Sequence, residues 1–252
     1  MVVDQDPLAQ FEIKKIADWS IGGVDVSFTN ASAWMVGVLV FLSLFMILSM
    51  RSKAVVPGRS QTVVEMVYEF VVNMVRDNLG REGKPYFPFI FTLFIFILGL
   101  NLAGMLPYSF TATSHIVVTL GLALTVFIGV TVLGFVKNGF GFLKLFVPAG
   151  APLWLLPMIV PIEIISYCVR PISLSVRLFA NMFAGHMTMK IFAGFVISLT
   201  AGLGIVGGFM AILPFVFTVM LTGLELLVAA LQAYVFAILT CIYINDALHP
   251  SH

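Results

Sequence analysis

Long apolar stretches separated by short polar connections make up most of this chain. One apolar segment occupies 33–51, and the stretch 86–136 holds two more. Two longer apolar segments follow at 152–200 and 205–247. Each segment reaches the roughly 20 residues that a helix needs to cross a bilayer. The pattern predicts an all-α polytopic membrane protein, a single membrane domain over 1–252 with about five membrane-crossing helices.

A different pattern marks the segment 60–80, which is too polar to span a membrane. Its apolar residues recur with the 3.6-residue period of a helix, and Glu65 and Glu69 lie on the opposite face. The order Thr62 to Glu65 matches a capping box at a helix start. We therefore expect an amphipathic helix on the cytoplasmic membrane surface or against another subunit.

The two last apolar segments are about twice as long as a span requires. A helix of about 40 residues is roughly 60 Å long, against a hydrocarbon thickness of about 30 Å. Such helices must tilt strongly or break, and hydropathy does not choose between these; we favour a strong tilt. The glycine-rich stretch 201–208 between them predicts an antiparallel hairpin.

Composition agrees with this architecture, since 60% of the 252 residues are apolar and only 10% are charged. The net charge of +1 gives no reason to expect a nucleic-acid partner. The two cysteines lie in apolar sequence without metal-ligand spacing, so neither a metal site nor a disulfide framework is expected. No cofactor motif is present in the sequence either.

The distribution of basic residues predicts the orientation. Lysine and arginine are concentrated between 51 and 85, which places that stretch in the cytoplasm and the segment 1–32 outside, in the periplasm. Five crossings then place the C-terminus in the cytoplasm. No basic region followed by a short apolar run precedes the first span, which suits a bacterial inner membrane, although an organelle-encoded protein would look alike.

Charged residues inside the long helices are the strongest functional signal. Arg177 is the most demanding, because a guanidinium at mid-bilayer costs roughly 2.5–3.5 kcal/mol and cannot lose its charge. Glu163 and Arg170 precede it at seven-residue steps and so lie on the same stripe of the helix. Ser166, Ser173 and Asn181 lie beside this stripe.

An antiparallel hairpin brings together residues whose positions have a nearly constant sum. This rule places Arg177 level with Gln232, and His186 level with Glu225 nearer the hairpin turn. Imidazole and a buried carboxyl group are suited to passing protons near neutral pH. The sequence thus suggests two polar routes that meet at a fixed cation, and no mobile carboxylate to oppose it is obvious in this chain. We expect a partner subunit to carry that acid.

Three sequence blocks resemble subunit a of F-type ATP synthases. The block SVRLFANMFAGH at 175–186 is similar to the arginine motif of that family. NLAGMLPYSFT at 101–111 is similar to its second-span motif, and LQAYVF at 231–236 to its last-helix motif. The resemblance extends from about residue 33 to 247. The acid that some bacterial members carry at the position of Gly104 is missing.

The resemblance implies the stator half of a rotary proton motor, with two offset half-channels beside a ring of c subunits that each carry a membrane carboxylate. It also implies b and b′ peripheral-stalk subunits and the rest of the F1Fo complex as partners, and no covalent catalysis by this chain. Arg177 would be the essential arginine. The residues that would line the outer half-channel or position Arg177 are Asn181, His186, Glu225 and Gln232, those toward the cytoplasmic exit are Glu163, Ser166, Arg170 and Ser173, and Asn101 lies in the second-span motif.

Other interpretations of these residues stay open at this point. Arg170 could reach lipid headgroups, and Glu163 could be a solvated helix-end residue. Ser166 and Ser173 could satisfy backbone groups near Pro171. His186, Glu225 and Gln232 could form a purely structural hydrogen-bond cluster.

Two other function classes fit the composition less well. A free-standing proton-coupled secondary transporter is the alternative, but the sequence shows no internal repeat. An intramembrane enzyme would need a catalytic motif such as His-Glu-x-x-His or Gly-x-Ser-x-Gly, and neither is present.

Overall fold

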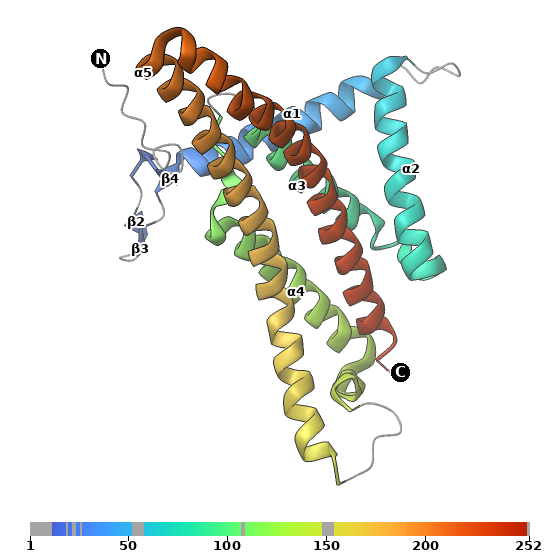
Figure 1. Cartoon of the computed structure of the whole chain (residues 1–252). Helices are drawn as coiled ribbons and strands as arrows, with labels where there is room; N and C mark the ends of the chain where they lie inside the picture. The colour runs from blue at the N-terminus through green and yellow to red at the C-terminus, as the bar shows by residue number, and fades with distance from the viewer. Residues whose placement is uncertain are drawn as a thin grey trace. The chain divides into compact units, whose positions relative to one another are not determined.

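A computed structural model describes residues 12–18, 20–21, 24–25, 27–51, 58–106, 109–147 and 154–250. Helices dominate these residues (Figure 1). The α-helices are α1 (Asn30–Ser49), α2 (Arg59–Leu79), α3 (Phe87–Gly104), α4 (Ile116–Asn138) and α5 (Leu156–Leu248), and the 3-10 helices are η2 (Gly80–Gly83), η3 (Ala112–Ser114) and η4 (Gly139–Phe146).

Five helical segments are long and apolar enough to cross a membrane. Helix α5 provides two of them because it changes direction at Gly204, whose φ of +54° and ψ of −129° are not helical. The candidate spans are Asn30–Ser49, Phe87–Gly104, Ile116–Phe146, Leu156–Gly202 and Gly204–Leu248. The prediction of an all-α protein with five spans is therefore confirmed, and the amphipathic helix is present as α2.

The start of α2 differs from the prediction. The helix begins at Arg59, with Gly58 as its N-cap, and the Thr62 hydroxyl donates backward to the Gly58 carbonyl oxygen at 3.0 Å. The capping box predicted at Thr62 and Glu65 is therefore wrong. Threonine inside a first turn can satisfy its hydroxyl on the carbonyl four residues earlier, so the motif appears without a helix start.

Short strands precede α1, and no pattern of alternating residues predicted them. β1 (Lys15–Ala17) pairs antiparallel with β4 (Phe28–Thr29), and β2 (Ser20–Ile21) pairs with β3 (Val24–Asp25). The Asn30 side chain joins this region to α1: its Oδ1 accepts from the Ala31 amide at 2.9 Å, and its Nδ2 donates to the Glu12 carbonyl at 3.1 Å. These bonds explain why α1 begins at Asn30.

The chain divides into two compact units. The first consists of 1–40, 98–115 and 178–232, and the second of 41–97, 116–177 and 233–252. In the first unit the two limbs of α5 lie side by side and antiparallel. The rings of Phe192 and Phe217 stack with centroids 5.6 Å apart, and the Thr222 hydroxyl lies 3.4 Å from the Met189 sulfur. The strong tilt that we favour stays a prediction.

In the second unit, aromatic packing joins α4 and η4 to the first limb of α5. Phe142 is almost fully buried and lies against Gly134, where a Cβ atom would collide with the ring. The Tyr167 hydroxyl and the Thr131 hydroxyl are 2.7 Å apart. The glycine thus permits the close approach that buries Phe142.

Candidate functional site

A histidine and a glutamate meet in the first unit, one from each limb of α5. The Nε2 atom of His186 lies 3.4 Å from Oε1 of Glu225, and their side chains are only 8% and 3% exposed. Neither carboxylate oxygen has a hydrogen-bond partner among the described residues. The structure thus brings together the two residues that the hairpin register placed level, in surroundings where an unpartnered charge is costly.

Thr111, from the connection after α3, contacts the same histidine. Its Oγ1 lies 3.1 Å from His186 Nε2 and donates to the Gly104 carbonyl oxygen at 3.3 Å. The hydroxyl of Thr111 and the carboxylate of Glu225 thus both lie close to the same nitrogen of the His186 imidazole.

The sequence reasoning missed Thr111 as a site residue. It is the last residue of the 101–111 block, and it lies 75 positions before His186. The one sequence signal for Thr111 was that this polar residue ends the 101–111 block, which resembles the second-span motif of the family. Because Thr111 lies outside the regular helices, no helical period predicted its position relative to either limb of α5.

Asn101 joins α3 to the second limb of α5. The asparagine is fully buried, and its Nδ2 donates to the Ala229 carbonyl oxygen at 3.1 Å. Ala229 lies one helical turn after Glu225. Asn101 Oδ1 has no hydrogen-bond partner among the described residues. Asn101 therefore holds the limb of α5 that carries Glu225, and its Oδ1 atom can accept a hydrogen bond from water.

Buried side-chain polar atoms without a partner gather in this unit. In the described part of the chain they belong to Asn101, Thr113, His115 and Glu225, and all four residues lie in the first unit. Native proteins rarely leave such atoms unsatisfied, and ordered water is the usual partner. Their concentration in the unit that holds His186 and Glu225 favours a hydrated region there.

Arg177 belongs to the second unit, where it lies on an exposed face of α5. Ser173, Val176 and Ala180, which are close to it along the helix, are also exposed. Arg177 forms no ion pair with any described residue. Arg177 is therefore an exposed permanent cation to which none of the described residues offers a carboxylate.

The remaining members of the polar stripe differ in their surroundings. Ser166 and Ser173 are exposed, and Glu163 is half-buried. Arg170 forms an ion pair with Asp246, with Nη1 and Oδ2 2.8 Å apart, and its guanidinium lies over the rings of Tyr167 and Tyr243. Arg170 thus already has a counter-charge, which Arg177 lacks.

Asn181 and Gln232 are half-buried residues of the first unit. Their side chains make no hydrogen bond to described residues. The predicted pairing of Gln232 with Arg177 stays a prediction. Within the described ranges, no group of three histidine, cysteine or acidic residues could hold a metal ion.

The family of the chain follows from comparison with known sequences. The family model described as ATP synthase A chain matches residues 31–245. The chain belongs to this family. The match covers the whole region that carries the site, and the interpretation as a free-standing secondary transporter has no support from it.

Curated relatives named ATP synthase subunit a come from alphaproteobacteria. The protein from Parvibaculum lavamentivorans is 60% identical over 247 residues, which cover 98% of this chain and 95% of the relative. The protein from Mesorhizobium japonicum is 58% identical and covers 98% of each chain. The protein from Chelativorans sp. is 60% identical, with 98% of this chain and 99% of the relative covered.

Proposed function

We propose that this chain is the proton-translocating stator subunit of the Fo motor of an F-type ATP synthase. The observation that carries this proposal is the exposed, unpaired Arg177 within an apolar span. A cation there needs an opposing charge, and a carboxylate that moves past on another subunit supplies one without blocking movement. Membership of the ATP synthase A chain family supports the same function.

The outer half-channel runs, in this proposal, through the hydrated region around His186 and Glu225. The His186 Nε2 atom lies 3.4 Å from Glu225 Oε1, so a proton that arrives on water can pass between the two groups. Asn101 and Thr111 hold the groups in place, and the unsatisfied atoms nearby hold the water. Asn181 and Gln232 belong, in this proposal, to the same half-channel.

The inner half-channel follows, in this proposal, the exposed serines of the polar stripe that precedes Arg177. Ser166 and Ser173 are exposed on the limb of α5 that carries Arg177, and we assign Glu163 to the cytoplasmic end of this half-channel. The two half-channels stay separate because Arg177 repels a proton that would cross directly. A proton must therefore travel on the partner's carboxylate, which couples proton flow to rotation of the c ring and to ATP synthesis. The chain itself performs no covalent step.

Contacts in the second unit support the proposed orientation. His249, just after α5, lies 3.7 Å from Glu82 in η2, and Asn138 at the end of α4 donates to the Ala247 carbonyl at 2.6 Å. The basic turn after α2, the end of α4 and the end of α5 therefore share one side of the membrane. The positive-inside rule makes this side cytoplasmic, with the N-terminus outside, in a bacterial inner membrane.

The proposed role as stator subunit also implies the partners of the chain. A ring of c subunits would face Arg177, and b and b′ subunits would hold the chain against it within the F1Fo complex. The lipid bilayer surrounds the remaining apolar surface, and no nucleic acid is involved. The many exposed large apolar side chains of α1 and α5 suit lipid and subunit contacts.

Replacement of Arg177 tests the proposal. Arg177→Ala should abolish ATP synthesis driven by a proton gradient in membrane vesicles, while the complex still assembles. Arg177→Lys should fail or nearly fail as well, because a desolvated lysine can lose its proton and a guanidinium cannot. Arg59→Ala, at an exposed arginine of α2, is the matched control and should leave synthesis unchanged. Normal coupled turnover in the Arg177→Ala vesicles would refute the proposal.

A further inference from the structure

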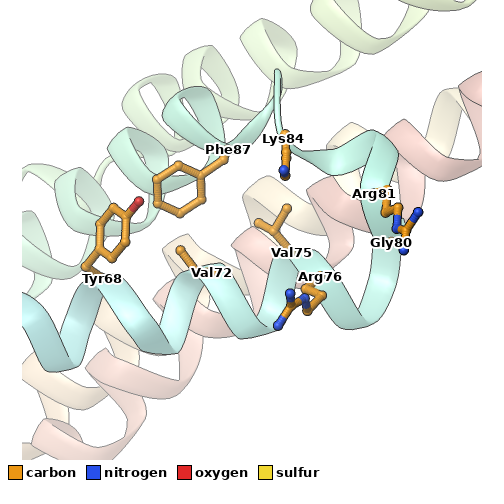
Figure 2. A pocket seen from close by; sticks show the side chains of 8 residues that line it. All are labelled: Tyr68, Val72, Val75, Arg76, Gly80, Arg81, Lys84 and Phe87. Atoms are coloured by element: carbon orange, nitrogen blue, oxygen red, sulfur yellow. The ribbon is translucent and has the colours of Figure 1, made fainter.

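A pocket of about 740 Å³ lies between α2 and the start of α3, and none of its lining residues belongs to the proposed proton path (Figure 2). Its charged lining residues are Arg76, Arg81 and Lys84, and Tyr68 and Phe87 form an aromatic wall. In Figure 2 the two rings lie together at one end, and Arg81 lies at the opposite end. The pocket therefore has a cationic part and an apolar part.

The three cations are available for a ligand. None of them forms an ion pair with a described residue. Two acids occur in the same stretch, Asp77 and Glu82, but neither lines the pocket, and the Glu82 carboxylate lies 3.7 Å from His249. No acidic side chain lines the pocket, so its field favours an anion.

The backbone holds the cations around the pocket. Gly80 ends α2 with a φ of +59°, which turns the chain into η2 and brings Arg81 to the pocket rim. A Cβ atom at Gly83 would lie 2.7 Å from Val75 Cγ1, so the turn packs tightly against α2. Two glycines thus fix the turn that carries Arg81 and leads to Lys84.

The aromatic wall places the pocket at the membrane boundary. Phe87 is the first residue of the candidate span α3. The Tyr68 ring meets the Phe87 ring edge to face, with centroids 5.0 Å apart, and reaches Phe91 one turn deeper, with centroids 5.9 Å apart. Tyrosine is enriched where membrane helices meet water. An acyl chain could follow these rings while a polar headgroup stays among the cations.

We propose that this pocket binds the phosphate headgroup of an anionic phospholipid. Arginine donates to phosphate oxygens in pairs, and basic pockets beside membrane helices are suited to such headgroups. The aromatic wall distinguishes a lipid from free phosphate, because only the lipid brings a chain that can cover Tyr68 and Phe87. The site is independent of proton translocation, so it can be tested by lipid retention alone.

The test measures how many anionic lipids stay bound to the full chain in its complex. The complex is exchanged into detergent with phosphatidylcholine, titrated with phosphatidylglycerol, and followed by native mass spectrometry. Each cation near a membrane surface contributes a factor of about five in affinity, so Arg81→Gln with Lys84→Gln should weaken retention about 25-fold. Arg59→Gln with Lys144→Gln removes the same charge outside the pocket and should change retention little.

Several results would overturn the proposal. Equal loss of lipid in the control pair would mean diffuse attraction by net charge. Displacement of phosphatidylglycerol by an equal concentration of inorganic phosphate would mean a free-anion site, and equal retention of phosphatidylcholine would mean a site without charge selectivity. If the complex with the double glutamine variant fails to assemble, the single variants Arg81→Gln and Arg81→Lys decide. Arg81→Gln should weaken retention of phosphatidylglycerol about fivefold, and Arg81→Lys should change retention little because it keeps the charge. Equal loss in both would also overturn it.

Discussion

The His186 imidazole and the Glu225 carboxylate lie 3.4 Å apart, Nε2 to Oε1, on opposite limbs of α5. This separation is longer than the 2.7–2.9 Å of a strong charge-assisted hydrogen bond. The pair is therefore close enough to exchange a proton after a small movement or through one water molecule, but it does not hold a proton tightly. A proton relay needs this balance, since each group must release what it accepts.

The first prediction concerns this pair. Glu225→Gln should slow proton translocation on the order of tenfold to a hundredfold, because an amide neither takes up nor releases a proton near neutral pH. The exchange of both residues, His186→Glu with Glu225→His, should recover part of the rate, since an acid and an imidazole again face each other. Fluorescence-quenching assays of proton pumping in inverted vesicles measure both effects.

The matched controls for this pair are the two single changes, His186→Glu and Glu225→His. Each leaves two like groups in a buried site, and each should be slower than the exchange variant. No recovery in the exchange variant over either single change would leave the proposed pairing unsupported.

The second prediction uses the glycine beside the carboxylate. A Cβ atom on Gly185 would lie 2.8 Å from Glu225 Oε1, so Gly185→Ala should displace the carboxylate. A shift of about 1 Å in a reacting group can cost up to about a hundredfold in rate, and we expect a loss of this order in proton translocation. Alanine favours a helix more than glycine does, so helix destabilisation cannot explain the loss. Gly223→Ala, where nothing lies within 4 Å, should keep the normal rate.

The third prediction concerns Thr111 as a positioning residue. Thr111→Val keeps the shape but removes the hydroxyl that hydrogen-bonds with His186, and one lost hydrogen bond should slow translocation about fivefold. Thr111→Ser keeps the oxygen and should stay near the normal rate. The pH dependence of pumping separates this role from simple packing, because valine should shift the profile and serine should not. Identical profiles in all three proteins would refute the positioning role.

Two features could be predicted from the sequence because they depend on regular helix geometry. They are the five spans and the pairing of His186 with Glu225. Five spans could be read from segment length and hydropathy, because a bilayer imposes a minimum helix length. The partnership of His186 with Glu225 followed from the constant sum of positions across a helical hairpin. Both arguments use a fixed rise per residue, and both hold wherever the helix is regular.

The missed contacts lie where the backbone is irregular or where a helix ends. Thr111 is in the connection between α3 and α4, where no period predicts which way a side chain points. Asp246 lies near the end of α5, and its pairing with Arg170 depends on how the second unit packs at that point. The strands before α1 have only two or three residues each, too few for an alternation to be recognised.

The last prediction separates Arg170 from Arg177. Arg170 is held by Asp246 at 2.8 Å, the two side chains are 26% and 22% exposed, and the guanidinium lies over two tyrosine rings. We therefore expect Arg170→Gln and Asp246→Asn each to lower the free energy of unfolding of the assembled chain by about 1–2 kcal/mol, discounted for partial exposure. The double variant should lose less than the sum, because each single change removes the same ion pair. Thermal unfolding of the purified complex measures stability, and pumping in vesicles measures function. Stability should fall while coupled pumping largely remains, in contrast to Arg177→Ala. Full loss of pumping with unchanged stability would place Arg170 in the proton path instead.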